Sequence, residues 1–391
     1  STSGCRARNP NETTPGAASP HPLEGAPPAD RQSRIRGVHL ALLFACGIGA
    51  SQKTWRFAMT KNVAVLGAGR IGRIHATNVA ALPGVELKFV CDPLADSAAS
   101  LAAALGAQVS TPEAVFADKT IDAVVIGSPT DTHSDLIHRA AAAGKHIFCE
   151  KPVDLSVPRA EDCARAVAKA GVACMIGFQR RFDPTFSEAK QRLVRGDVGA
   201  PEMLVITSRD PGAPPPEYLK GSGGIFRDML IHDFDIFRWI LCVDEDDEAE
   251  TLYATGSVLT DPAIAQVGDV DSTAVTIRTR KGRLAQINTS RRAAYGYDQR
   301  FEVLGSKGML QCGNHKPSEV LQSDALGVHA DKPEHFFLQR YRDAYRLELA
   351  HFFECLQSGK PFRTTVADGV AAQKLADAAA QSWASGQIVR L

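Results

Sequence analysis

One short stretch of the chain gathers side chains that could move a proton. The segment "SGGIFRDMLIHDFD", residues 222–235, places three carboxylates and a histidine in an apolar run. As a helix, it would carry Asp228, His232 and Asp235 on one face. His232 could then take a hydroxyl proton, while Asp228 one turn away orients the ring and stabilises the imidazolium. A metal site, a solvated helix face and a buried His–Asp pair without chemistry stay open as alternatives, although no cysteine or second histidine lies nearby to support a metal.

A second stretch supplies a cation. The segment "KHIFCEKP" ends a predicted strand at Glu150, Lys151 and Pro152. In an open parallel sheet, ligands bind outside the carboxyl ends of the strands. The Lys151 ammonium could there hydrogen-bond a substrate hydroxyl and stabilise negative charge on its oxygen. Because a lysine at a strand end is usually a solvated surface residue, this interpretation depends on a cofactor beside it.

A glycine motif predicts that cofactor. The segment "VAVLGAGRIGRIHA" has Gly67, Gly69 and Gly72 in G-x-G-x-x-G spacing between a predicted strand and a predicted helix. These glycines allow a tight turn, a close pyrophosphate and close helix packing, and the helix N-terminus attracts the anion. Asp92 ends the next strand and could bind the adenosine ribose hydroxyls. Since "CDPLADS" offers no arginine for a 2′-phosphate, we expect NAD rather than NADP.

The elements that must position these residues change character along the chain. Short β-branched segments alternate with Ala-rich helical ones from Asn62 to about Phe182, which predicts a parallel sheet covered on both faces. Later segments have period two, with hairpin turns at 281–282 and 306–308. We therefore expect an α/β protein, with an N-terminal Rossmann doubly wound parallel sheet and a C-terminal α+β domain with a large open, mostly antiparallel sheet.

The predicted domains follow from this division. Residues 59–181 should form the NAD-binding Rossmann domain, and residues 182–391 a domain for substrate binding and oligomerisation. Residues 1–58 are expected to be disordered or a spurious extension. They include a basic flank and a short apolar run like a secretory signal core, too short to span a bilayer. Because a strand follows Met59 at once, we expect the true start there.

Composition limits the partners. In 391 residues, Lys+Arg and Asp+Glu each total 44, so the balance favours neither nucleic acid nor membrane as a partner. The nine cysteines form no C-x-x-C pair and their number is odd. They are typical of reduced thiols in a cytoplasmic protein, without a disulfide or metal framework.

The glycine motif, "CEKP" and "RDMLIHDFD", in this order, give the chain its resemblance to a known family. From about Met59 to Leu391 it resembles the Gfo/Idh/MocA oxidoreductases, and within them the inositol dehydrogenase branch. The segments "SRDPGAPPPEYLKGSGGIFRDM" and "YGYDQRFEVLGSKGM" carry the narrower resemblance. It implies NAD-dependent oxidation of myo-inositol to 2-keto-myo-inositol, a polyol substrate, and a homotetramer.

The resemblance also implies roles for single residues. Lys151 and His232 would handle the proton, with Asp228 as the partner of His232. Asp235, Tyr297 and Arg181 would contact the substrate, with Tyr295 or Arg180 as further candidates. His133 would lie near the nicotinamide ribose. The predicted cofactor-binding set is Gly67, Gly69, Arg70, Ile71, Gly72, Asp92, Ser128, His133, Glu150 and Lys151.

Two other functions remain open. One is a dehydrogenase of another cyclitol or of an aldose. The other is a non-catalytic regulator that binds NAD and a sugar. The joint presence of Lys151, Asp228 and His232 argues against the regulator.

Overall fold

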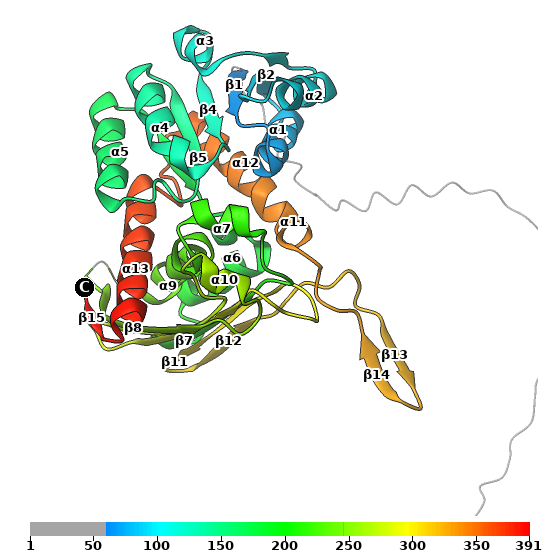
Figure 1. Ribbon diagram of the computed structural model, residues 1–391, viewed down its shortest axis with the longest axis vertical. Helices are drawn as coiled ribbons and strands as arrows, with labels where there is room; N and C mark the ends of the chain where they lie inside the picture. Colours follow the sequence, from blue (N-terminus) through cyan, green and yellow to red (C-terminus); the bar gives the residue numbers. More distant parts are fainter. Residues whose placement is uncertain (1–59, 245) are drawn as a thin grey trace, which may run out of the picture. The chain divides into compact units, whose positions relative to one another are not determined.

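The computed structural model describes residues 60–244 and 246–391 (Figure 1). The predictions about residues 1–58 and about a start at Met59 lie outside the described residues. Two sheets organise the rest of the chain.

The N-terminal sheet has six parallel strands in the order β3-β2-β1-β4-β5-β6. Its strands are β1 (Lys61–Leu66), β2 (Val85–Cys91), β3 (Gln108–Val109), β4 (Ala123–Ile126), β5 (His146–Glu150) and β6 (Cys174–Gly177). The helices between them are α1 (Arg70–Ala81), α2 (Ala95–Leu105), α3 (Pro112–Ala117), α4 (His133–Ala142) and α5 (Val157–Ala170). The β4 strand is apolar and buried throughout, as expected where helices cover both faces. The predicted doubly wound sheet is confirmed.

The C-terminal sheet has seven strands in the order β12-β11-β7-β10-β9-β8-β15. Its strands are β7 (Pro201–Arg209), β8 (Ala249–Ser257), β9 (Ser272–Thr279), β10 (Leu284–Ser290), β11 (Asp298–Gly305), β12 (Gly308–Cys312) and β15 (Val389–Arg390). Every pair is antiparallel except β7 with β10. Burial alternates along β9 with period two. Both predicted hairpins and the mostly antiparallel sheet are confirmed.

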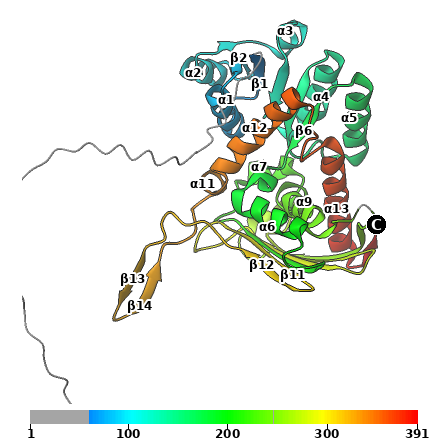
Figure 2. The ribbon, with the colours of Figure 1, turned by 180° about the vertical axis from the view of Figure 1, so that it is seen from behind.

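Helices cover one face of this sheet (Figures 1 and 2). They include α6 (Pro184–Arg195), α9 (Ile231–Leu241) and α13 (Val366–Ser385), which contact its strands. The shorter helices of the C-terminal half are α7 (Pro216–Ser222), α8 (Ile225–Asp228), α10 (Ala263–Gln266) and α11 (Phe337–Arg340), and α11 packs against the helix that follows it. Inward side chains of the strands and helices, among them Ile206, Ile287 and Phe237, form one buried core. Within the described ranges, no helix combines the length and apolar character needed to cross a bilayer.

Two late helices join the sheets. Helix α12 (Arg342–Ser358) packs against α1, and its Tyr345 and Phe352 enter the core under the N-terminal sheet. Helix α13 contacts both α5 and α9. The predicted domain division between residues 181 and 182 remains a prediction. The packing of α12 and α13 shows that the C-terminal part of the chain contributes side chains to the core of the N-terminal sheet.

A small hairpin extends away from both sheets in Figures 1 and 2. It pairs β13 (Leu321–Asp324) with β14 (Gly327–Ala330), and all eight of these residues are exposed. The sequence analysis did not predict this element.

Candidate active site

The glycine loop after β1 has the shape that a dinucleotide needs. A Cβ on Gly72 would lie 1.9 Å from the Gly67 carbonyl oxygen, so only glycine lets α1 pack this closely. Around Gly69, by contrast, an added Cβ meets nothing within 4 Å, and no side chain caps the helix there. The open space and free N–H groups at the start of α1 fit a bound pyrophosphate.

Asp92 lies directly beneath this loop. Its carboxylate accepts hydrogen bonds from the backbone N–H groups of Ala68, at 2.6 Å, and Leu94, at 2.8 Å. Asp92 therefore fixes the loop to the end of β2, and its predicted contact with ribose remains a prediction. Arg70 and Ile71 begin α1 in the same loop, with Arg70 exposed.

Lys151 follows β5, at the carboxyl edge of the N-terminal sheet. Its ammonium donates a hydrogen bond to the backbone oxygen of Asp228 at 2.9 Å and lies 3.8 Å from the Asp228 carboxylate. This hydrogen bond joins two residues that lie 77 positions apart in the sequence. The fold therefore brings the segment that ends at Lys151 next to the segment that carries Asp228.

In the described residues, the carboxylate of Asp228 is bonded to groups other than His232. Helix α8 ends at Asp228 and α9 begins at Ile231, so a single helical face carrying Asp228, His232 and Asp235 is wrong. The Asp228 carboxylate instead accepts a hydrogen bond from the Tyr218 hydroxyl at 2.9 Å and lies 3.5 Å from the Arg291 guanidinium. In the described ranges, no hydrogen bond or ion pair joins Asp228 to His232.

His232 is a buried, neutral imidazole. Burial, and then the charges of Lys151 and Arg180, lower the pKa of His232 well below its ordinary value of 6.5. Its Nδ1 atom is buried without a hydrogen-bond partner in the described part of the chain, and the ring packs edge-on against Phe178 at 6.2 Å. A neutral imidazole in this position can accept a proton.

Comparisons with known proteins agree with this architecture. Residues 61–178 match the oxidoreductase family with an NAD-binding Rossmann fold, and residues 186–311 match the GFO/IDH/MocA C-terminal domain. The chain belongs to this family. It is therefore an NAD-dependent oxidoreductase, and the predicted cofactor is confirmed.

Individual relatives match over most of their length. The chain is 45% identical to inositol 2-dehydrogenase of Rhizobium meliloti over 83% of this chain and 98% of that protein. A solved structure of a myo-inositol dehydrogenase from Corynebacterium glutamicum has a TM-score of 0.81 and 43% identity, covering 85% of this chain and 99% of that chain. Scyllo-inositol dehydrogenase from Lactobacillus casei, solved with NAD(H) and scyllo-inositol bound, has a TM-score of 0.79 and 28% identity over the same shares.

Two predicted substrate residues of this Gfo/Idh/MocA protein lie inside the fold instead. Asp235 is fully buried, and its oxygens accept hydrogen bonds from the Arg181 guanidinium at 2.9 and 2.5 Å. Arg181 also donates to Asp368 at 3.0 Å. Each charge is thus held by the other within the core, which favours a structural role, and the contact of Asp235 and Arg181 with substrate remains a prediction.

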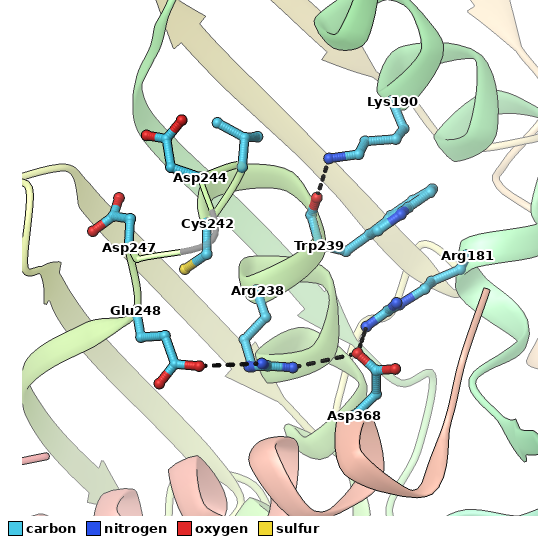
Figure 3. A pocket seen from close by; sticks show the side chains of 10 residues that line it. Arg181, Lys190, Arg238, Trp239, Cys242, Asp244, Asp247, Glu248 and Asp368 are labelled. Carbon is cyan, nitrogen blue, oxygen red and sulfur yellow. Dashed lines mark hydrogen bonds and ion pairs between the residues drawn. The ribbon is translucent and has the colours of Figure 1, made fainter. Parts of the chain in front are cut away.

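Figure 3 shows Arg181 and Asp368 of this network among the side chains that line a pocket. A cavity of about 290 Å³ there is lined by Arg181, Lys190, Arg238, Trp239, Cys242, Val243, Asp244, Asp247, Glu248 and Asp368. Arg238 lies between Glu248 and Asp368, at 3.6 and 3.4 Å. None of Lys151, Asp228 and His232 lines this cavity, so it is separate from the candidate active site.

Arg180, the second arginine that the sequence suggested for substrate contact, lies close enough to His232 for its charge to act on the imidazole. It donates a hydrogen bond to Asp233 at 2.6 Å, and its charge acts on both His232 and Tyr297. Tyr297 is nearly fully buried, and burial raises its pKa well above 10. The predicted contact of Tyr297 with substrate remains a prediction. Tyr295 is more exposed and donates to Asp298 at 2.6 Å.

The predicted cofactor residues beyond the glycine loop are differently placed. His133 is buried, with Nδ1 2.7 Å from the Pro152 oxygen and Nε2 2.9 Å from the Ser128 oxygen. Its ring therefore joins the loops after β4 and β5, and its place near the nicotinamide ribose remains a prediction. Ser128 remains in the β4 loop, where its hydroxyl pairs with that of Thr132 at 2.6 Å. The carboxylate of Glu150 lies 2.7 Å from His75 on α1 and accepts a hydrogen bond from the backbone N–H of Lys151, and its contact with the cofactor remains a prediction.

The sequence analysis missed several polar residues around Asp228. Besides Tyr218, Arg291 lies after β10 and Asp210 after β7. Burial raises the pKa of Asp210 to about 6. Because β7 and β10 are parallel neighbours, their carboxyl ends share one edge, which brings Asp210 and Arg291 together. The segments "SRDP" and "TSRR" contain these charged residues directly after predicted strands. Only the pairing of β7 with β10 reveals that the two segments lie side by side.

Proposed function

We propose that this enzyme oxidises the axial 2-hydroxyl of myo-inositol to a ketone, giving 2-keto-myo-inositol. The observation that carries the proposal is the contact of Lys151 with Asp228 beside the buried imidazole of His232. Lys151 lies at the carboxyl edge of the N-terminal sheet, the same edge at which the glycine loop follows β1. The names of the similar proteins supply the substrate class. A hydroxyl-rich ring suits a site of buried polar groups, because each such group needs a partner.

His232 acts as the general base in this mechanism. Its depressed pKa keeps the imidazole neutral at neutral pH, so it is ready to take the hydroxyl proton. Bound NAD supplies the acceptor for the hydride. Arg180 and Lys151, which disfavour the imidazolium, promote return of the proton to solvent after turnover.

Lys151 stabilises the substrate oxygen as its proton leaves. Its ammonium is held by the backbone oxygen and carboxylate of Asp228, so it needs little reorganisation when charge develops. Asp228 is accordingly a positioning residue for Lys151, assisted by Tyr218 and Arg291. This replaces the predicted pairing of Asp228 with His232.

The test is a steady-state assay with NAD on a panel of inositol isomers and aldoses. Wild-type protein should oxidise myo-inositol with the highest kcat/KM, and Lys151→Ala should lower kcat by roughly a hundredfold or more. Lys169→Ala, at the exposed end of α5, is the matched control and should keep wild-type rates. Full activity of Lys151→Ala would contradict the mechanism.

A second candidate is a dehydrogenase for another cyclitol or an aldose. The similar scyllo-inositol dehydrogenase structure favours keeping that candidate. In the same panel, a higher kcat/KM on scyllo-inositol or on glucose would select it. Absence of NAD reduction with every polyol, together with measurable NAD binding, would favour the regulator instead.

We further propose a cytoplasmic homotetramer that associates through the open face of the C-terminal sheet. Met309, Leu304, Met203 and Leu284 stand opposite one another on β12, β11, β7 and β10, each 38–46% exposed. Such a row of exposed apolar side chains is typical of an interface. The seven cysteines in the described ranges are free thiols, which supports a reducing compartment.

A further inference from the structure

Three buried ionisable side chains behind Lys151 have no role in the mechanism above. They are His75 on α1, Glu150 at the end of β5 and Glu348 on α12. One nitrogen or oxygen atom from each lies within 4.8 Å of those of the other two. All three residues are less than a tenth exposed, although they come from elements far apart in the chain.

Glu150 is the centre of this cluster. One carboxylate oxygen lies 2.7 Å from His75 Nε2, and the other accepts a hydrogen bond from the backbone N–H of Lys151 at 3.3 Å. A Cβ on Gly177 would lie 3.1 Å from the first oxygen, so the glycine in β6 leaves the carboxylate its space. Glu150 therefore connects the cofactor-binding helix to the backbone of the lysine.

Glu348 completes the cluster from α12. It is fully buried, and neither of its oxygens has a hydrogen-bond partner in the described part of the chain. Burial, and then the charge of Glu150, raise the pKa of Glu348 well above 4.5. An unpaired buried carboxylate would be very costly, whereas a neutral carboxylic acid is a hydrogen-bond donor that can face Glu150.

A metal ion would be the other explanation for such a cluster. Two ligands of a tetrahedral zinc are about 3.3 Å apart when each bond is about 2.0 Å. The 2.7 Å between His75 and Glu150 is shorter and is a hydrogen-bond distance. The rings of Phe148 and Tyr345 pack edge-on against His75 at 5.0 and 5.8 Å, so the surroundings are aromatic.

We propose that Glu348 is a neutral carboxylic acid packed within 4.8 Å of the Glu150 carboxylate, and that the cluster of Glu348, Glu150 and His75 positions Lys151 for catalysis. These three are positioning residues, because they act on the reaction through Lys151. The inference rests on the proposed function only in the role of Lys151. Its physical content is that α12, from the C-terminal part of the chain, sets the geometry of the lysine by placing one uncharged carboxyl group beside Glu150.

The test compares three variants of the full-length enzyme. Glu348→Gln keeps a neutral side chain of the same shape, so its kcat should stay close to the wild-type value. Glu348→Ala and Glu150→Gln should each lower kcat roughly tenfold to a hundredfold through misplacement of Lys151. NADH affinity, measured by fluorescence titration, should stay unchanged in both, which a general loss of structure would not allow. Glu354→Gln, a partly exposed acid on α12, is the control.

An infrared spectrum at neutral pH supplies a readout that needs no substrate. A carbonyl band of a protonated carboxylic acid should be present in the wild type and absent from Glu348→Gln. Absence of that band in the wild type, or equal kcat losses in Glu348→Gln and Glu348→Ala, would overturn the proposal. So would a stoichiometric metal that copurifies with the wild type and is lost from Glu348→Gln. If no inositol is oxidised, the proposed function fails alone and the infrared band still decides whether Glu348 is neutral.

Discussion

At the scale of single residues, the site combines one neutral base with two groups of opposite charge. His232 is surrounded by the positive charges of Lys151 and Arg180, which, after burial, keep its pKa low. Asp228 binds the lysine and is itself held by Tyr218. The charges are therefore arranged so that the base stays unprotonated while the ammonium stays fixed.

The pKa of His232 predicts a pH dependence of stability. Because that pKa is lower in the folded than in the unfolded protein, the unfolded chain binds more protons below about pH 6.5. The free energy of unfolding should therefore fall as pH drops below 6.5, by about 1.4 kcal/mol for each pH unit until the folded pKa is reached. Urea unfolding at several pH values measures this slope.

The matched variant is His232→Gln, which cannot titrate. Its free energy of unfolding should depend less steeply on pH over the same range than that of the wild type. His351, whose pKa is lowered to about 4, contributes a slope of the same sign in both proteins. Equal slopes for wild type and variant would contradict a depressed pKa at His232.

The buried pair of Arg181 and Asp235 predicts an effect on stability, not on substrate affinity. Asp235→Asn removes a charge from a pair that is nearly inaccessible to water. It should lower the free energy of unfolding by about 3 kcal/mol, with KM for the polyol unchanged in the folded fraction. Urea unfolding and steady-state kinetics measure the two quantities. Asp343→Asn, which changes an exposed carboxylate on α12, is the control. A large rise in KM of Asp235→Asn without loss of stability would instead support contact of Asp235 with substrate.

At the scale of elements, the glycines of the β1–α1 turn have separable tasks. Gly72→Ala would place a Cβ 1.9 Å from a backbone oxygen, so the helix must move and the domain should be strongly destabilised. Gly69→Ala meets no protein atom within 4 Å, so stability should be kept while NAD affinity falls, because the methyl group takes the space of the pyrophosphate. Thermal unfolding and NADH titration distinguish the two. Equal effects of both variants on stability would contradict this division.

The sequence predicted the elements better than their contacts. Both sheets, the two hairpin turns and the position of Lys151 followed from periodicity and glycine spacing. The break between α8 and α9 did not, because Met229 and Leu230 keep right-handed helical dihedral angles and no proline or glycine marks it. The partners of Asp228 and Asp235 lie up to 77 residues away, and only the assembled fold selects them.

At the scale of the whole molecule, the sheets depend on each other through α12 and α13. Helix α12 brings Glu348 to the end of β5, and α13 begins with a capping box at Thr365 and Asp368, where Asp368 also binds Arg181. The helices therefore extend the C-terminal part of the chain into the environment of Lys151. Among the described residues, no helix covers the outer face of the C-terminal sheet (Figure 2).

That outer face predicts where association can be broken. Leu304 lies in the centre of the apolar row, opposite Met203 on one side and Met309 on the other. Leu304→Arg places a charge where a second copy would have to bury it, so the tetramer should dissociate to smaller species, as measured by light scattering coupled to size-exclusion chromatography. Leu94→Arg, an equally apolar exposed position outside the sheet, should leave the assembly intact. A tetramer that survives Leu304→Arg would exclude this face as the interface, because the introduced guanidinium could not be accommodated in a packed apolar contact without loss of affinity.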